Sequence, residues 1–412
     1  MSDSTMESVE SFRGRARAWL AENMPPRDDA PPPLIEDDAH EWQRARELQK
    51  NLHAGGFAGI CFPREYGGLG LTFAHQQAFT EESDPYEMPV LLNMPTFAIC
   101  AATLLDMGDE EQKRARIGAA IRGEEILCQF LSEPSGGSDL AGLITRADRD
   151  GDGWVLNGAK TWSTSAYAAD WGLCLARTDW DVPKHRGLTM FLVPTKAPGV
   201  TMNRIRMVNG VREFCEEFFD DVVLPASAVV GEVGDGWTVA SRQLFHERNS
   251  MGGGSPYVSG RGEPRTLPRV TPLNAARASG RSDDPRVRQM FGEHLTLTRV
   301  HEQTAERVTR AIETEVLPPA AASMLRLLHA EAVQRGDDLA LRIAGANAAT
   351  GAGCDEGVGG RTAIGYLMRQ GTSLGGGSTE MSRNLISERL LGMPREAAPD
   401  RDVPFKQVKR GR

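Results

Sequence analysis

The sequence predicts an α+β protein in which helices come first, short strands occupy the middle and helices return at the end. Apolar residues recur at helix spacing up to about residue 125 and again after residue 231. Between these regions, short apolar runs are divided by Gly, Asn, Asp and Pro, which is typical of an antiparallel sheet or a small barrel. We therefore expect three domains, at 1–125, 126–230 and 231–412.

The N-terminal region is predicted to contain an initial capped amphipathic helix and further helices over 41–52, 76–83 and 97–107. The segment 62–72 is rich in turn residues and should interrupt the helices. The sequence of residues 108–112 predicts a turn and an N-cap before another helix.

The middle region is predicted to form a sheet from short strands joined by tight turns. The expected strands are 126–131, 153–156, 171–176, 188–193 and 217–223. Asp150-Gly151-Asp152-Gly153 predicts a hairpin turn, and Asn157-Gly158 predicts a second one.

The C-terminal region is predicted to be helical again. Helices are expected over 236–248, 285–316, 321–349 and 378–391. The segment 252–281 is rich in Gly, Pro, Ser and Arg, so we expect an irregular excursion there.

Composition excludes several classes of protein. The 412 residues include 47 Lys and Arg against 56 Asp and Glu, a net charge of −9 that argues against nucleic acid as the main partner. No apolar run approaches the roughly 20 residues that span a bilayer, and the N-terminus has no apolar signal core, so we expect a cytoplasmic protein without a membrane span. The cysteines lack metal-ligand spacing and are expected to be buried thiols; they are Cys61, Cys100, Cys128, Cys174, Cys215 and Cys354.

Two motifs in the middle region could contact a flat polar ligand. In Leu131–Asp139, a glycine pair flanked by hydroxyls would let backbone N–H groups approach a ligand, although a plain strand-ending loop explains it as well. In Asn157–Thr164, Trp162 could lie against a ring while neighbouring hydroxyls bond to its edge. A core tryptophan beside two solvated hydroxyls is an equal alternative.

Two further motifs lie in the C-terminal region. Glu247 ends a helix with an apolar side, where partial burial would raise its pKa as a general base requires. The alternative is an exposed helix-end Glu paired with an Arg. The triplet Gly375-Gly376-Gly377 runs into a helix start that favours an anion or a polar ring edge, unless Ser378 or Thr379 merely caps the helix.

Together, in this order, these segments resemble the acyl-CoA dehydrogenase family over roughly residues 10–395. The likeness is carried by PREYGGLGLT (63–72), SEPSGGSDLAG (132–142), NGAKTWST (157–164), VVLP (222–225), GDGWTVA…HER (234–248) and GGGSTEMSRNLISERLLGMPRE (375–396). The resemblance implies an N-terminal helical domain, a middle β-barrel domain and a C-terminal four-helix bundle. It also implies an FAD cofactor, removal of hydrogens from Cα and Cβ of an acyl-CoA thioester to give a trans-2-enoyl-CoA, and electron transfer to an electron-transfer flavoprotein.

By position, the resemblance assigns most of the site residues. Those matched to flavin contacts are Gln129, Leu131, Ser132, Trp162, Ser163, Thr164, Ser378 and Glu380; those matched to the CoA side are Ser138 and Arg248.

The base departs from the commoner family pattern. Aligning Gly377-Ser378 with the family's Gly-Thr/Ser pair places Gly376, which cannot accept a proton, at the usual position of the carboxylate. A minority of the family supplies the base from an earlier Leu-x-x-Glu-Arg helix, and Leu244–Arg248 has that form. The resemblance therefore assigns Glu247 as the base. His246 is an inferior candidate because its helix position points about 100° away.

The partner side of the flavin is a second departure. Arg288–Gly292 has the letters of the family's Arg-x-x-Phe-Gly motif but is expected inside a helix, and the later glycine-rich stretch reads Gly345–Gly351. We therefore expect a heterotetramer with a second acyl-CoA dehydrogenase subunit, as in actinobacterial enzymes that act on sterol side chains, with a homotetramer as the alternative. The expected substrate carries a bulky or branched acyl group. A flavin oxidase or monooxygenase on this scaffold, or a non-catalytic partner subunit, remains open.

Overall fold

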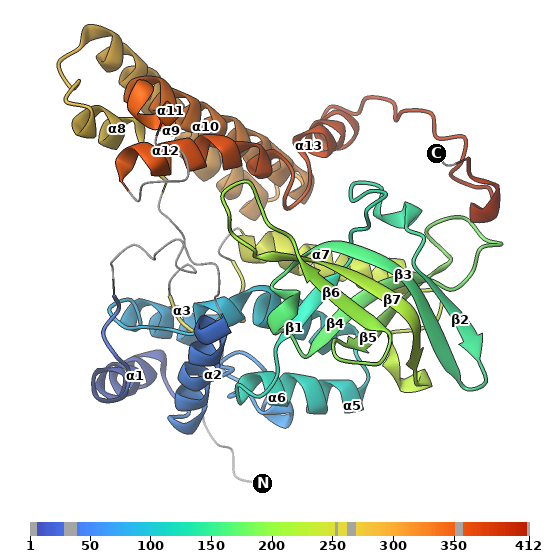
Figure 1. The fold of residues 1–412 in the computed structure, drawn as a ribbon. Coiled ribbons are helices and arrows are strands. Elements are labelled where there is room, and N and C mark those ends of the chain that lie inside the picture. Colours follow the sequence, from blue (N-terminus) through green and yellow to red (C-terminus); the bar gives the residue numbers. More distant parts are fainter. Residues whose placement is uncertain (1–5, 29–38, 252–253, 262–268, 351–356, 410–412) are drawn as a thin grey trace.

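The computed structural model describes residues 6–28, 39–251, 254–261, 269–350 and 357–409. An N-terminal group of helices and a central sheet lie side by side, and a separate group of C-terminal helices stands above them (Figure 1). The structure confirms the predicted α+β class and the order of helices, strands and helices.

The N-terminal helices lie close to their predicted positions. They are α1 (Val9–Asn23), α2 (Ala39–Ala54), α3 (Phe73–Glu82), the π-helix η3 (Asn93–Ala101), α4 (Ala102–Met107), α5 (Glu110–Gln112), the π-helix η4 (Lys113–Ile117) and α6 (Gly118–Ile121). Side-chain oxygens cap two of these helices: the Ser8 side chain accepts a hydrogen bond from Ser11 N, and that of Asp109 accepts one from Gln112 N.

Among the described residues, one helical segment, Val90–Met107, is long and apolar enough to cross a membrane by length and composition. Most of it is buried inside the protein, where Phe97, Cys100 and Leu104 belong to the main core. Its apolar character is therefore explained by its place at the centre of the core.

The central sheet contains eight strands. They are β1 (Leu127–Phe130), β2 (Arg146–Asp150), β3 (Gly153–Thr164), β4 (Trp171–Arg177), β5 (Leu188–Pro194), β6 (Val200–Arg204), β7 (Phe214–Leu224) and β8 (Val229–Val230). Their order is β6-β7-β3-β2-β4-β5-β8, and β1 pairs with β4 beside this path.

The prediction of a closed antiparallel barrel is wrong in two respects. The edge strands β6 and β8 do not pair with each other, and the two-residue β8 is too short to close the sheet. In addition, β1 runs parallel to β4, and β2 meets β4 in parallel through the single pair Arg146–Arg177. The sheet is therefore open and mixed.

The predicted hairpin at Asn157-Gly158 is also wrong. Both residues lie inside the twelve-residue strand β3, where the pairing with β7 shifts register between Leu156 and Gly158. The shift is a β-bulge in which two residues of β7, Asp220 and Asp221, lie opposite Asn157. Gly158, the next residue of β3, has a φ of +147°. The other predicted turn, at 150–153, does join β2 to β3.

The C-terminal helices are α7 (Gly236–Met251), α8 (Pro272–Ala278), α9 (Pro285–Glu313), α10 (Ala322–Ala344), α11 (Ala346–Thr350), α12 (Val358–Met368) and α13 (Thr379–Leu385). Helix α7 leaves this group and packs on η3, α4 and β5, whereas α8, α9, α12 and α13 all pack on α10. As expected, Arg288 lies inside a helix, near the start of α9, where it pairs with Asp283. The excursion after α7 contains the regular helix α8, which the composition did not predict.

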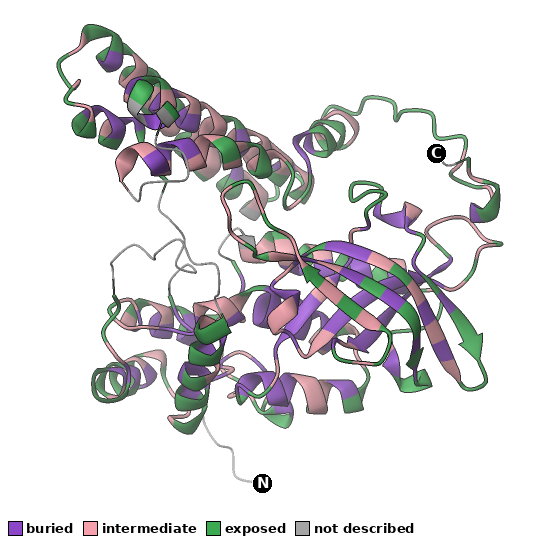
Figure 2. Ribbon diagram, in the orientation of Figure 1, coloured by how far each residue is buried: buried purple, intermediate pink, exposed green. Residues whose placement is uncertain are grey.

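The core is unequally shared between these parts. One continuous apolar cluster fills the N-terminal helices, the sheet and the inner side of α7, whereas the C-terminal helices enclose a small cluster of mostly short side chains. Figure 2 shows the same contrast, with buried residues dense in the sheet and sparse in the upper helices. Cys100, Cys128, Cys174 and Cys215 are buried as predicted, Cys61 is half-buried, and Cys354 lies outside the described residues.

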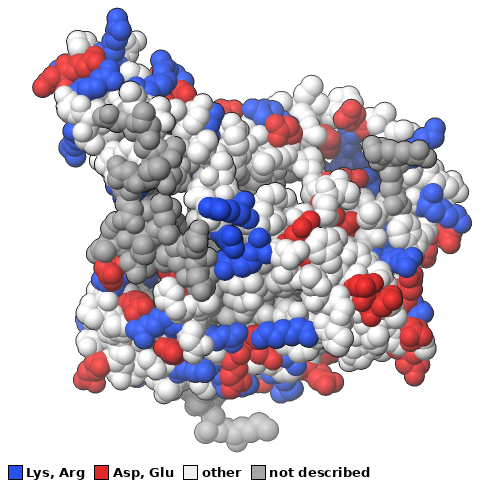
Figure 3. All heavy atoms as spheres, in the orientation of Figure 1, with Lys and Arg blue, Asp and Glu red and all other residues white. Residues whose placement is uncertain are grey.

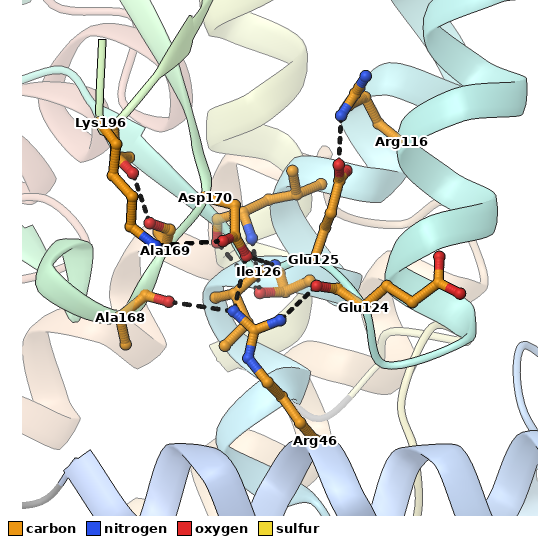
Figure 4. A network of polar contacts seen from close by, with 12 residues as sticks. Arg46, Arg116, Glu124, Glu125, Ile126, Ala168, Ala169, Asp170 and Lys196 are labelled. Atoms are coloured by element: carbon orange, nitrogen blue, oxygen red, sulfur yellow. Dashed lines mark hydrogen bonds and ion pairs between the residues drawn. The ribbon is translucent and has the colours of Figure 1, made fainter. Parts of the chain in front are cut away.

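A polar clamp joins α2 to the first strands of the sheet (Figure 4). The Arg46 guanidinium donates to an Asp170 carboxylate oxygen at 2.6 Å and to the carbonyl oxygen of Glu124 at 2.5 Å. The same Asp170 oxygen accepts the backbone N–H of Ile126 at 2.9 Å. One arginine therefore fixes the N-terminal helices to the chain that enters β1 and β4.

Charges of both signs are mixed over most of the face in Figure 3, with one group of basic side chains near its centre. Many of the exposed charges form ion pairs at helix surfaces, such as Arg44 with Glu87 at 2.7 Å.

Candidate active site

The predicted site residues lie in two separate parts of the chain. The first group, on β1, β3, α7 and the loop after β1, holds Gln129, Leu131, Ser132, Ser138, Trp162, Ser163, Thr164, Glu247 and Arg248. The second group, on α13 and its N-cap, holds Ser378 and Glu380.

Helix α7 positions Glu247. The helix starts tightly against β5, since a Cβ on Gly236 would lie 2.6 Å from the Cα of Thr189. Val239, Ala240 and Gln243 are buried along one side of α7. Glu247 follows Gln243 by one turn, and its Oε2 accepts a hydrogen bond from Gln129 Nε2 on β1 at 3.2 Å.

The surroundings of Glu247 suit a proton acceptor. Burial raises the pKa of this carboxyl above its ordinary value, while the Gln129 hydrogen bond and the charge of Arg248 act in the opposite direction. Burial is the main reason that the pKa of the Cys100 thiol is raised, and the charge of Glu247 raises it further. Glu247 is therefore the half-buried helix-end carboxylate that the functional hypothesis requires, rather than an exposed one.

His246 points to a different neighbour, as expected for the adjacent helix position. Its Nε2 lies 2.7 Å from an Asp106 carboxylate oxygen, which also accepts from Arg242 Nε. The imidazole is therefore engaged with α4, away from Gln129.

The two middle-region motifs lie side by side. The Lys160 ammonium donates to the carbonyl oxygen of Leu131 at 3.0 Å, and Thr161 N donates to that of Ser132 at 2.9 Å. Trp162 is 56% exposed on the outer side, so the alternative of a core tryptophan is wrong. Ser163 is buried on the inner side and Thr164 is half-buried.

A buried charge pair supports this edge and was missed by sequence reasoning. Glu133 Oε1 lies 3.0 Å from the Lys160 ammonium, and both side chains are almost fully buried. Burial alone would raise the pKa of Glu133, but Lys160 and hydrogen bonds from Thr145 and Ile144 together lower it. The sequence signal that could have revealed this pair is Lys160, a charged residue at an inward-facing position of a strand whose side chains alternate between the two faces.

The residues assigned to the CoA side are both exposed. Ser138 lies in the loop 134–139, whose Asp139 is held by the Lys184 ammonium at 3.0 Å. Arg248 lies at the end of α7 beside Glu247. Both are accessible to a ligand that enters from solvent.

The second group surrounds the start of α13. The Ser378 hydroxyl accepts the N–H of Met381 at 3.2 Å, so Ser378 is the N-cap, and Glu380 is exposed in the first turn. Gly376 and Gly377 have φ values of +72° and +98°. Arg326 of α10 donates to the carbonyl oxygen of Gly375 at 2.6 Å. No hydrogen bond between described residues joins α13 to the first group.

Comparison with known proteins settles the family. Family models described as the N-terminal, middle and C-terminal domains of acyl-CoA dehydrogenase match residues 6–124, 128–222 and 234–391. The chain belongs to the acyl-CoA dehydrogenase family. It is 35% identical to "Acyl-CoA dehydrogenase IpdE1" of Mycobacterium tuberculosis, over 95% of this chain and 100% of that protein.

Solved structures agree with this assignment. The "Tcur3481-Tcur3483 steroid ACAD" has 26% identity and a TM-score of 0.69, and covers 96% of this chain and 100% of that one. The "ChsE4-ChsE5 complex from Mycobacterium tuberculosis" has 25% identity and a TM-score of 0.66 over the same shares. The solved structures that this acyl-CoA dehydrogenase resembles thus include one named as a steroid ACAD and one named as a complex of two proteins.

Proposed function

We propose that this acyl-CoA dehydrogenase removes hydrogens from Cα and Cβ of a bulky or branched acyl-CoA, of the steroid side-chain kind, to give a trans-2-enoyl-CoA. The observation that carries the proposal is the half-buried Glu247 carboxylate near the C-terminal end of α7, which accepts a hydrogen bond from Gln129 of β1. The steroid relatives support the bulky acyl group.

The residues present fit an FAD cofactor. Hydrogen bonds join the loop after β1, which contains two adjacent glycines, to the part of β3 that carries the exposed Trp162 indole and the half-buried Thr164. An indole with polar groups around it suits a flat ring with polar atoms on its rim. Ser132 and Leu131 would hold the same ring from the loop after β1. FAD would supply the acceptor for the hydride from Cβ.

The chain's own residues would handle the proton. Glu247, as a carboxylate, would accept the α-proton of the thioester, and its raised pKa brings its proton affinity closer to that of so weak an acid. Arg248 and Ser138 would hold the CoA portion at the solvent-exposed side. Gln129 would orient Glu247 through their hydrogen bond.

We further propose that the working enzyme is a heterotetramer with a second acyl-CoA dehydrogenase subunit, located in the cytoplasm and reoxidised by an electron-transfer flavoprotein. Ser378 and Glu380 lie on a helix with no hydrogen bond to the first group among the described residues. A second subunit that approaches the C-terminal helices would complete the flavin contacts. Two solved relatives, Tcur3481-Tcur3483 and ChsE4-ChsE5, are named as pairs of proteins, which supports this assembly.

The test of the activity is anaerobic bleaching of the flavin by a panel of acyl-CoAs, with wild type and Glu247→Gln. The variant should lose at least about 10³-fold in the reduction rate, the upper range for removal of a general base. Gln243→Leu, one turn away in the buried side of α7, is the matched control and should lose far less. Flavin reduction at the wild-type rate in Glu247→Gln would show that another group is the base. Rapid reoxidation of the flavin by air would favour an oxidase.

A further inference from the structure

A group of buried polar side chains lies on the inner face of the sheet, behind the site edge. Lys160 and Ser163 of β3 and Glu217 of β7 are all within this group, and Lys160 and Glu217 are 0% exposed. In the β3–β7 register, Lys160 is the direct partner of Glu217. None of these side chains has a role in the proposed proton transfer.

On the opposite face, Trp162 forms a β-bulge. The pairing of β3 with β7 shifts register between Thr161 and Ser163, which leaves Trp162 as the extra residue. Its φ is +63°, a left-handed conformation that bulky residues rarely adopt because it is strained. Such a conformation persists only when neighbouring contacts hold it.

Glu217 holds Ser163, the residue that follows the bulge. The Ser163 hydroxyl donates to Glu217 Oε2 at 2.8 Å, inside the sheet. Outside the sheet, the Trp162 indole meets only the edge of the Phe214 ring among the aromatic contacts described, at 5.7 Å between centroids. The Ser163–Glu217 hydrogen bond is thus the polar anchor next to the bulge.

We propose that Glu217 is a positioning residue that acts through Ser163 to hold the Trp162 bulge against the flavin edge. The contact of Trp162 with flavin rests on the proposed function, but the mechanical link from Glu217 to Trp162 does not.

The need to neutralise the charge of Lys160 does not explain the presence of Glu217 at this buried position. The Lys160 ammonium already binds Glu133 and the carbonyl oxygen of Leu131, both at 3.0 Å. The second oxygen of Glu217, Oε1, has no hydrogen-bond partner within the described part of the chain. The bond from Ser163 is therefore the side-chain hydrogen bond that the described residues give to the buried Glu217 carboxyl.

The strength of this anchor should depend on pH. Burial raises the pKa of Glu217 to about 7, against the opposing effects of the Ser163 hydrogen bond and the Lys160 charge. The other groups that sense or affect its charge are Glu216 on β7 and the thiols of Cys128 on β1 and Cys174 on β4. A hydrogen bond to an ionised carboxylate is stronger than one to a neutral carboxyl, so the bulge should be held more tightly above the pKa.

The direct test measures the fluorescence emission of Trp162 between pH 5 and pH 9, in the full protein with and without bound FAD. The Trp162 signal is the emission of wild type minus that of Trp162→Phe. The difference should titrate with a midpoint near 7 in wild type. It should stop titrating in Glu217→Gln and Ser163→Ala, which remove the charge and the hydroxyl. Glu216→Gln, on the neighbouring β7 position, is the matched control and should keep the titration.

A second readout separates positioning from folding. Glu217→Gln can still accept the Ser163 hydrogen bond and should keep the wild-type far-UV circular dichroism. Ser163→Ala should slow flavin reduction by about tenfold at pH 8, the fold-change that corresponds to one hydrogen bond, with Ser163→Thr restoring it. A wild type without a titration near pH 7, or the same titration in Glu217→Gln, would overturn the proposal. A protein that never binds flavin would overturn the proposed function alone, since the emission test needs no flavin.

Discussion

At the scale of single residues, the activity should follow the ionisation of Glu247. Its pKa is raised by burial, and only the ionised form accepts a proton. The rate of flavin reduction should therefore be at its plateau above this raised pKa and fall as pH decreases through it. Anaerobic stopped-flow measurements from about pH 4 to pH 9 would show this. A rate that stays constant down to pH 4.5, the ordinary value for Glu, would contradict the role.

Local motifs made Glu247 predictable, whereas Glu217 was not. The Leu-x-x-Glu-Arg pattern lies within five consecutive residues, and one helix then fixes which neighbour faces β1. The partner of Ser163 depends instead on the register of β7 against β3, between residues 54 positions apart. Pairing at such separation is set by packing of the whole sheet and is not encoded in either segment alone.

At the scale of elements, Gly158 follows directly after the β3–β7 bulge, where the sequence predicted a turn. A Cβ there would lie 2.6 Å from Thr145 Oγ1 and 2.7 Å from Thr145 Cα, in a backbone conformation that only glycine adopts easily. We expect Gly158→Ala to lower the free energy of unfolding by about 2 kcal/mol or more.

Urea unfolding followed by circular dichroism would measure this loss. Gly136→Ala is the control, because nothing lies within 4 Å of a Cβ at Gly136 and its φ is not left-handed. Equal stability of the two variants would show that the strand tolerates a side chain at the bulge.

The helices were predicted well and the sheet less well, for the same physical reason. Helix spacing is local, so α2, α9 and α10 lie near their predicted ranges. Closure of a barrel depends on whether the edge strands meet, and Asn-Gly fits a bulge as readily as a turn when the strand continues past it. The excursion after α7 hid α8 because Pro272 at its start resembled a loop signal.

At the scale of the whole molecule, the C-terminal helices leave apolar side chains uncovered. Exposed examples on these helices and their connections are Leu295, Leu297, Val300, Leu367, Leu374, Leu385 and Leu391. The core that these helices enclose is small, formed by Val270, Ala275, Ala276, Val287, Ala340 and Ile343. Apolar surface of this extent on a poorly filled unit is typical of a subunit interface.

Purification alone and with a co-expressed second acyl-CoA dehydrogenase subunit would test the proposed assembly. The chain alone should carry little flavin, and the pair should elute as a yellow heterotetramer, because in the proposed assembly the second subunit would cover the leucines and complete the flavin contacts. Light scattering and the absorbance at the flavin band would measure both. A flavin-loaded homotetramer of this chain would contradict the heteromeric assembly and leave the chemistry intact.

The most direct test of the central claim isolates removal of the α-proton from the rest of the reaction. A 3-thia acyl-CoA has no hydrogen on its β-atom to transfer as hydride, so exchange of its α-hydrogens with D2O, followed by mass spectrometry, reports only the base. Wild type should exchange them, and Glu247→Gln with normal flavin content should do so at least about 10³-fold more slowly. Exchange at the wild-type rate in Glu247→Gln would show that another group removes the proton.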